Sequence, residues 1–212
     1  MNRGLRPPFQ MAEQYVGQHR GTAIICGSAP CVFSDLEKAR SLFPDADILG
    51  VNNTAAMIPE IEHVWTQHAE HAKKFKEAAP RKIYIHSKPR RYRNGGGMWL
   101  LPVADYLWEK VDYQWPDLHW VSGSSGVAGA LWAKHGLGYD MVIMCGIPLS
   151  EDSTKYTDKY PSRPTKDGGN FAEIRQLRKW TATLQQYVED GRAAGIYSMS
   201  GTTNRITGDP PC

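Results

Sequence analysis

Short apolar runs alternate along the chain with segments in which apolar residues recur every three or four positions. The apolar runs are rich in isoleucine, valine and other residues that favour strands, and most end in a glycine or a polar side chain. This alternation is typical of βα units arranged around a mostly parallel sheet. We expect strands at residues 23–26, 47–51, 63–66, 82–86, 141–145 and 196–199.

Helical periodicity fills most of the intervals between these strands. Leu36, Ala39, Leu42 and Phe43 repeat at helical spacing, and Ser34 and Pro44 predict the start and the stop of that helix. Further helices are expected at 69–78, at 99–108, from Ser124 or Ser125 to Gly136 or Gly138, and at 171–188 with Asn170 as N-cap.

The length of 212 residues suits a single α/β domain. We therefore predict one Rossmann-like domain over residues 21–212, preceded by an N-terminal arm at 1–20. Its sheet should have about six or seven strands, mostly parallel, with helices on both faces. A glycine-rich segment around 87–121 interrupts the βα rhythm as a lid-like insertion, and a polar loop spans about 149–170.

Several predicted strands end in residues suited to binding an anion or a nucleoside. In open α/β sheets ligands bind beyond the carboxyl ends of the strands, where turn amides and helix N-termini attract phosphate. An asparagine amide offers both a donor and an acceptor to a ribose hydroxyl or a base edge. The expected binding residues are Gly27, Ser28, Ala29, Pro30, Asn52, Asn53, Ser124, Ser125, Gly126 and Gly146.

Positive charge is concentrated in one stretch, although the formal net charge is only +3. Between residues 73 and 93 the chain has nine lysines and arginines, with Glu77 as the only acid. This stretch is a solvated surface, a lid over a phosphate, or a contact with a nucleic-acid backbone. The residues that would contact nucleic acid are Lys88, Arg90, Arg91 and Arg93.

Cysteine usage and hydropathy point to the cytoplasm. The four cysteines have no paired metal spacing, and two of them end apolar runs, which suits small core residues in a reducing compartment. The beginning of the sequence lacks the apolar stretch of a secretory signal, and no later run is long enough for a membrane helix. We expect no membrane span.

Four motifs resemble those of bacterial sialyltransferases that use a CMP-sugar donor. They are Gly27-Ser-Ala-Pro-Cys-Val32, Val51-Asn-Asn53, Ser124-Ser-Gly-Val127 and Gly146-Ile-Pro-Leu149. The resemblance implies that the first glycine turn, the strand-end asparagine and the Ser-Ser-Gly helix start bind the cytidine monophosphate part of a nucleotide-sugar, without an obligatory metal.

Two other likenesses widen the interpretation. The architecture is also similar to the pterin pyrophosphokinase-like and flagellin-glycosylation-associated group. The stretch from Thr66-Gln-His-Ala-Glu70 through Ser198-Met-Ser-Gly-Thr202 resembles small uncharacterised proteins of phages and prophages more closely. The latter likeness covers most of the chain, carries no established activity, and implies a phage protein in the cytoplasm of a bacterial host cell.

The chain departs from the sialyltransferases at their late catalytic histidine. Gly168-Gly-Asn-Phe171 stands where that histidine is expected, and no histidine follows His135. His68, with Glu70 to orient it, is therefore the expected catalytic base. Other candidates for this role are Asp152, Tyr156 and Asp158. His63, His68 and His71 lack a carboxylate or cysteine to complete a ligand set, so no metal site is expected.

The leading functional hypothesis is a glycosyltransferase that transfers a sugar from a nucleotide-sugar, with a CMP-sugar as the favoured donor, to a hydroxyl acceptor. One alternative is Mg-ATP-dependent pyrophosphoryl transfer to a small hydroxymethyl compound. Another is a phage-associated protein that binds nucleotides or nucleic acid, including a DNA-modifying enzyme.

Overall fold

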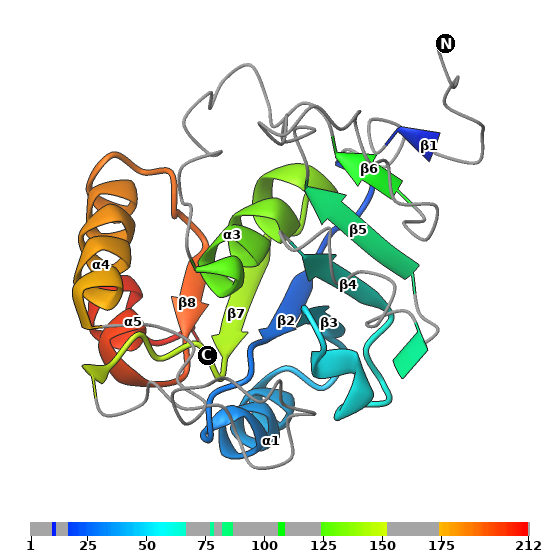
Figure 1. The fold of residues 1–212 in the computed structure, drawn as a ribbon, viewed down its shortest axis with the longest axis horizontal. Helices are drawn as coiled ribbons and strands as arrows, with labels where there is room; N and C mark the ends of the chain where they lie inside the picture. Colours follow the sequence, from blue (N-terminus) through cyan, green and yellow to red (C-terminus); the bar gives the residue numbers. More distant parts are fainter. Residues whose placement is uncertain are drawn as a thin grey trace, which may run out of the picture.

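The strands of the described residues lie in one parallel sheet, ordered β1-β6-β5-β4-β3-β2-β7-β8 (Figure 1). The computed structural model describes residues 10–11, 17–66, 77–78, 82–86, 106–108, 124–151 and 174–211. The strands are β1 (Gln10–Met11), β2 (Thr22–Cys26), β3 (Asp47–Val51), β4 (His63–Thr66), β5 (Lys82–His86), β6 (Tyr106–Trp108), β7 (Met141–Cys145) and β8 (Ile196–Ser198). The predicted α/β class with a parallel sheet is confirmed, and within the described ranges the sheet has eight strands instead of the six or seven expected.

Helices cover both faces of the sheet, as the sequence predicts. The helical elements are α1 (Val32–Leu42), η2 (Thr54–Ala56), α3 (Ser125–Leu131), η5 (Trp132–Leu137), α4 (Ile174–Glu189) and α5 (Gly201–Thr207). Figure 1 shows α3 in front of β7, and α4 beside α5 at the β8 end of the sheet.

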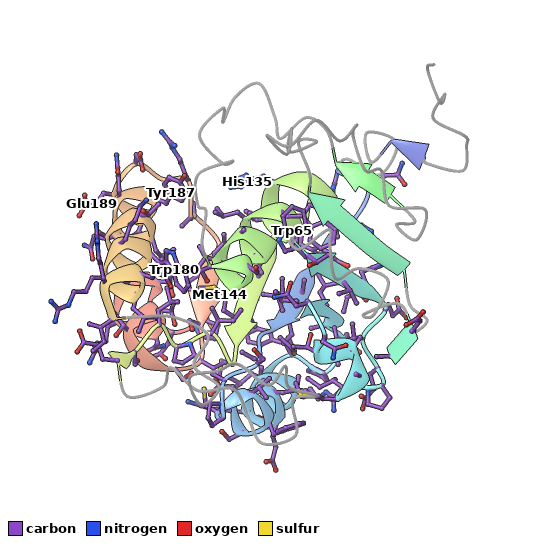
Figure 2. All side chains as sticks on the ribbon, viewed as in Figure 1. Trp65, His135, Met144, Trp180, Tyr187 and Glu189 are labelled. Carbon is purple, nitrogen blue, oxygen red and sulfur yellow. The ribbon has the colours of Figure 1, made fainter. Side chains whose placement is uncertain are left out.

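Alternating side chains of the central strands form two separate cores. Ala23 and Ile25 of β2 face α3 and α4, whereas Ile24 and Cys26 face α1. Because both faces are covered, the central strands are continuous apolar runs. On the α3 side, Trp65 stacks on Trp132, with ring centroids 5.2 Å apart, and Figure 2 shows Trp65 beneath the helices.

Two local predictions were wrong. Helix α1 begins at Val32 because its chain turns directly after Ala29, and the Ser34 hydroxyl donates to the Cys31 carbonyl instead of capping the helix. The helix expected at 99–108 is contradicted at its end, where Tyr106–Trp108 is strand β6 paired with β5. Aromatic residues favour strands when a neighbouring strand is available to pair with them.

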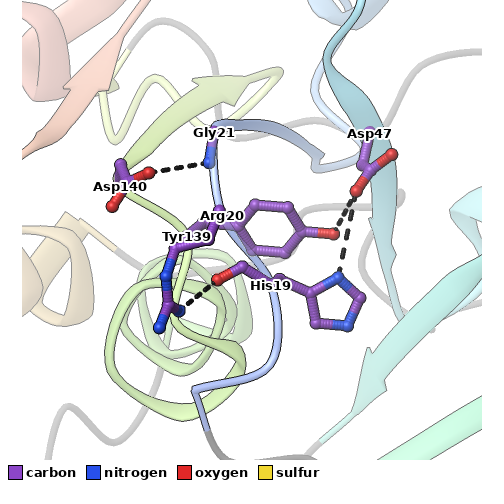
Figure 3. Close-up of polar contacts among 6 residues, drawn as sticks. All are labelled: His19, Arg20, Gly21, Asp47, Tyr139 and Asp140. Atoms are coloured by element: carbon purple, nitrogen blue, oxygen red, sulfur yellow. Dashed lines mark hydrogen bonds and ion pairs between the residues drawn. The ribbon is translucent and has the colours of Figure 1, made fainter.

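Polar contacts fix the amino ends of the central strands, at the edge opposite the expected site (Figure 3). The Tyr139 hydroxyl donates to Asp47 over 2.6 Å, and His19 stacks on the Tyr139 ring with its Nδ1 3.9 Å from the same carboxylate. The Gly21 amide donates to Asp140 over 2.8 Å. Residues 17–21, mostly within the predicted N-terminal arm, thus bind the edge of the domain.

Candidate functional site

The sheet has a topological switch point between β2 and β7. From β2 the chain proceeds through β3 and β4 in one direction, whereas β7 and β8 lie on the other side of β2. At the carboxyl ends of these strands is a cavity of about 90 Å³, called here the switch-point cavity. Its lining residues are Gly27, Ser28, Ala29, Val51, Asn52, Ser124, Ser125, Gly126, Gly146, Ile147, Pro148, Leu149 and Trp180.

Eight of the ten residues predicted to bind a nucleotide line this cavity, and two do not. Pro30 is exposed in the turn before α1. Asn53 is buried as the N-cap residue of η2, at 8% exposure. The two are adjacent to lining residues, but they belong to the turn and the short helix instead of the cavity wall.

The turn after β2 lies directly against the turn after β7. The Gly27 amide donates to the Cys145 carbonyl over 2.8 Å, and the Ala29 amide donates to the Gly146 carbonyl over 3.2 Å. A Cβ atom on Gly27 would lie 2.4 Å from the Gly146 oxygen and 2.5 Å from Cγ1 of Ile147. Only glycine therefore allows the two walls of the cavity to approach this closely.

Asn52 contributes an oriented amide at the end of β3. It has a φ of 58°, in the left-handed region that asparagine tolerates better than most residues. The Thr66 hydroxyl of β4 donates to Asn52 Oδ1 over 2.8 Å. This contact orients the side chain and leaves Nδ2 as a donor that has no acceptor in the part of the chain described.

The Ser-Ser-Gly segment begins α3 as predicted. Ser124 is the N-cap, and its hydroxyl accepts from the Val127 amide over 3.3 Å. The amides of Ser125 and Gly126 belong to the first turn, where no helix carbonyl precedes them. A Cβ on Gly126 would lie 2.7 Å from Cγ2 of Ile147, so this helix start also needs glycine for close contact.

The wall after β7 continues from Gly146 to Leu149. Leu149 has a φ of 46°, a strained conformation for a branched residue that the surrounding contacts must maintain. The start of α5 supplies those contacts, because the Thr202 and Thr203 amides donate to the Pro148 carbonyl over 2.8 and 3.1 Å. The Thr203 hydroxyl donates to the Ile147 carbonyl over 2.7 Å.

A larger hollow adjoins the switch-point cavity at Leu149. This α4–α5 hollow has a volume of about 720 Å³ and is lined by the segment after β7, α4 and α5. Arg205 lines it, and so does Arg178, which pairs with Glu151 over 3.0 Å. Figure 2 shows Trp180 on the side of α4 that faces the sheet, and Trp180 is one of the residues that line the switch-point cavity.

Sequence reasoning missed Asp35 and Trp180, whereas Ser200 was expected at the end of the last strand, facing the crevice. Asp35 is 6% exposed, and its carboxylate accepts from the Gly146 amide over 2.9 Å and from the Ser200 hydroxyl over 2.6 Å. The burial of Asp35 could have been predicted from its position in the helical repeat, because Asp35 lies on the same buried helix face as Val32, Leu36 and Ala39. An acid on an apolar face is buried only with partners.

Burial suppresses ionisation of the cysteines beneath the cavity. Loss of hydration raises the pKa of Cys26 to about 12 and that of Cys31 to about 11, although the Ser200 hydroxyl partly offsets the latter. The pKa of Cys145 is raised for the same reason. These thiols are protonated, weakly nucleophilic side chains at neutral pH.

We expect Cys26 and Cys31 to resist Ellman's reagent at pH 8 in the folded protein and to react at once in guanidinium. The pKa values of both thiols are higher in the folded protein than in the unfolded chain. The two protonated thiols therefore make their full contribution to the free energy of unfolding below about pH 8.5, and this contribution is lost as the pH rises toward 11–12. The free energy of unfolding, measured with urea in a Cys212→Ser background, should fall less steeply above pH 9 after Cys26→Ala. An equal fall in the free energy of unfolding with and without Cys26→Ala would contradict the raised pKa of Cys26.

The remaining predicted residues lie outside the described ranges. These are the expected catalytic pair His68 and Glu70, the basic residues Lys88, Arg90, Arg91 and Arg93, and most of the segments 87–121 and 149–170. Within the described ranges, no three His, Cys, Asp or Glu side chains come together as a metal-binding group. None of the helices in those same ranges is long and apolar enough to cross a bilayer.

Comparison with known proteins gives one informative likeness. No family model and no curated protein matches the chain. Among solved structures, the fold is similar to that of the sialyltransferase CstII from Campylobacter jejuni, determined in complex with a substrate analogue, cytidine-5'-monophosphate. The match has a TM-score of 0.50 and 15% sequence identity, and it covers 92% of this chain and 87% of that chain. At this identity, the likeness establishes a shared fold over nearly the whole chain.

Proposed function

We propose that the protein is a glycosyltransferase that binds a nucleotide-sugar, with a CMP-sugar as the favoured donor, and transfers the sugar to a hydroxyl acceptor. The observation that carries the proposal is the switch-point cavity, built from two glycine turns, an oriented asparagine amide and a serine-capped helix start. The similarity in fold to a structure that contains cytidine-5'-monophosphate supports the same choice of ligand.

The chemistry of the lining suits a phosphate and a ribose. Backbone amides at the Ser125–Gly126 helix start, together with the Ser28 and Ser125 hydroxyls, donate to phosphate oxygens. Asn52 Nδ2 donates to a ribose hydroxyl or a base edge. The cavity of about 90 Å³ accommodates only part of a nucleotide, since pockets for whole ligands usually measure about 300–1,000 Å³.

The α4–α5 hollow provides room for the other reactant. It meets the cavity at Leu149 and has a volume of about 720 Å³. We assign this hollow to the sugar of the donor and to the acceptor. Thr181, Gln185 and Arg205 line it and can form hydrogen bonds with the hydroxyl groups and any anionic groups of these two ligands.

The reaction would be a direct displacement at the anomeric carbon. The acceptor oxygen forms a bond to that carbon while the bond from the carbon to the phosphate oxygen breaks, and the nucleotide leaves with the electron pair. Amides and the Ser125 hydroxyl stabilise the charge that develops on the phosphate. His68, oriented by Glu70, takes the proton of the acceptor hydroxyl.

Thermal stabilisation by nucleotides tests this proposal. CMP and CDP are expected to raise the melting temperature equally with EDTA and with Mg²⁺, because the proposed contacts come from amides and hydroxyls. A ligand at a hundred times its Kd adds about 2.7 kcal/mol to the free energy of unfolding. UMP, UDP, GDP, ADP, ATP and NAD serve as matched comparisons.

Two other outcomes would overturn the proposal. A shift with ATP only in the presence of Mg²⁺ would indicate pyrophosphoryl transfer. No shift with any nucleotide would leave the basic segment at 88–93 as the surface to test, by DNA binding that falls steeply with salt.

A further inference from the structure

Asp35 is a buried acid that contacts the turns of two other strands. It follows β2 within the first turn of α1, on the helix face that packs on the sheet beside Leu36. Its Oδ2 atom accepts from the amide of Gly146, directly after β7, and from the hydroxyl of Ser200, two residues after the end of β8. One carboxylate oxygen therefore joins the carboxyl ends of β2, β7 and β8.

The two donors determine the shape of the cavity wall. Gly146 has a φ of 65°; its amide donates to Asp35 while its carbonyl accepts from the Ala29 amide. The Gly146 peptide groups are thus held from both sides by the segment after β2. Ser200 precedes α5, and the carbonyl oxygens of Ser200 and Ile147 share the Thr203 hydroxyl as a donor, at 2.8 and 2.7 Å.

Gly146 was predicted to be a binding residue, and its amide donates to Asp35. Gly146 contributes to the cavity by its close approach to Gly27, where a side chain would collide.

We infer that Asp35 is a positioning residue of the nucleotide site: it sets the segment from Gly146 to Leu149 against the Gly27 turn without contacting the ligand. This inference rests on the proposed function for the identity of the ligand. The organisation of the turns by Asp35 rests on the contacts alone.

The test compares Asp35→Ala, Asp35→Asn and Leu36→Ala by calorimetric titration with CMP. We expect Asp35→Ala to raise the Kd about tenfold or more, because misplaced contacts weaken binding steeply. Asp35→Asn should stay within about threefold, since a carbonyl oxygen can accept both hydrogen bonds. Leu36→Ala removes a buried side chain from the same helix face without touching the turns, so its Kd should match the wild type.

Hydrogen exchange supplies a readout that does not depend on the ligand. In Asp35→Ala, amide exchange should accelerate selectively in peptides covering 27–31, 146–150 and 199–204, whereas Leu36→Ala should affect α1 and the core beneath it. If Asp35→Ala does not fold, Ser200→Ala removes one of the two donors and should give a smaller change at the same turns.

The outcomes separate the two hypotheses. Selective exchange at the turns, in a protein whose wild type binds no CMP, would support Asp35 as organiser of the turns and refute the proposed function. The positioning role would be refuted if Asp35→Ala gave the same pattern of amide exchange as Leu36→Ala. It would also be refuted if exchange at the turns accelerated in Asp35→Ala while the Kd for CMP stayed unchanged.

Discussion

Replacement of Gly27 by alanine is expected to remove most of the affinity for CMP while the protein stays folded. The new Cβ would lie 2.4 Å from the Gly146 carbonyl oxygen, so the turns after β2 and β7 must separate. Overpacking of this kind costs about 1–3 kcal/mol of folding stability. We expect the separated turns to lose a similar free energy of CMP binding, where about 1.4 kcal/mol corresponds to a factor of ten in affinity. A loss of roughly 10- to 100-fold in CMP affinity is the expected result, measured by calorimetric titration.

The matched control is Gly191→Ala. Gly191 lies after α4 and has a φ of 77°, and among the described residues other than Gly191 and its chain neighbours, no heavy atom lies within 4 Å of the place that the alanine Cβ would occupy. Its substitution costs about 1–2 kcal/mol of backbone strain, so stability should fall by a similar amount in both variants. Equal CMP affinity of the two variants would show that the Gly27 turn is not part of the binding site.

Replacement of His68 by alanine should lower sugar transfer by about 10²–10⁴-fold, the usual contribution of a general base. The CMP affinity should change by no more than a few fold, because His68 is assigned to the acceptor and not to the nucleotide. His68 comes two residues after Thr66, whose hydroxyl orients Asn52 at the cavity. Initial rates with a CMP-sugar donor and separate titrations with CMP would distinguish the two effects.

His135→Ala controls for the loss of an imidazole. His135 lies at the other end of the sheet, where its Nε2 contacts the Arg192 carbonyl over 2.7 Å. Turnover in this variant should equal that of the wild type. Normal turnover in His68→Ala would exclude the assigned role and direct attention to Asp152, Tyr156 and Asp158.

The regular part of the fold was predictable because its strands are buried on both sides. β2 and β7 are unbroken apolar runs, so their limits could be read to within a residue. β1 and α5 could not be found in this way. β1 has two residues and exists through its pairing with β6, and α5 is a polar segment held by Pro148 and Thr203 contacts.

The same distinction holds for the site. The glycine turns and the Ser-Ser-Gly helix start were visible because local backbone chemistry determines them. The Asp35 contacts join residues that are 111 and 165 positions apart, and no local pattern specifies such partners. Trp180 likewise reaches the cavity only through the packing of α4.

The order of the strands in the sheet also affects how the chain folds during its synthesis. β2 pairs with β3 soon after synthesis, but its other neighbour, β7, ends only at Cys145. The ribosome adds about 5–20 residues per second, so the edge of β2 that pairs with β7 remains unpaired for roughly 10 s during synthesis. An unpaired strand edge is a template for aggregation. The nascent chain is therefore expected to need shielding by a chaperone during this interval.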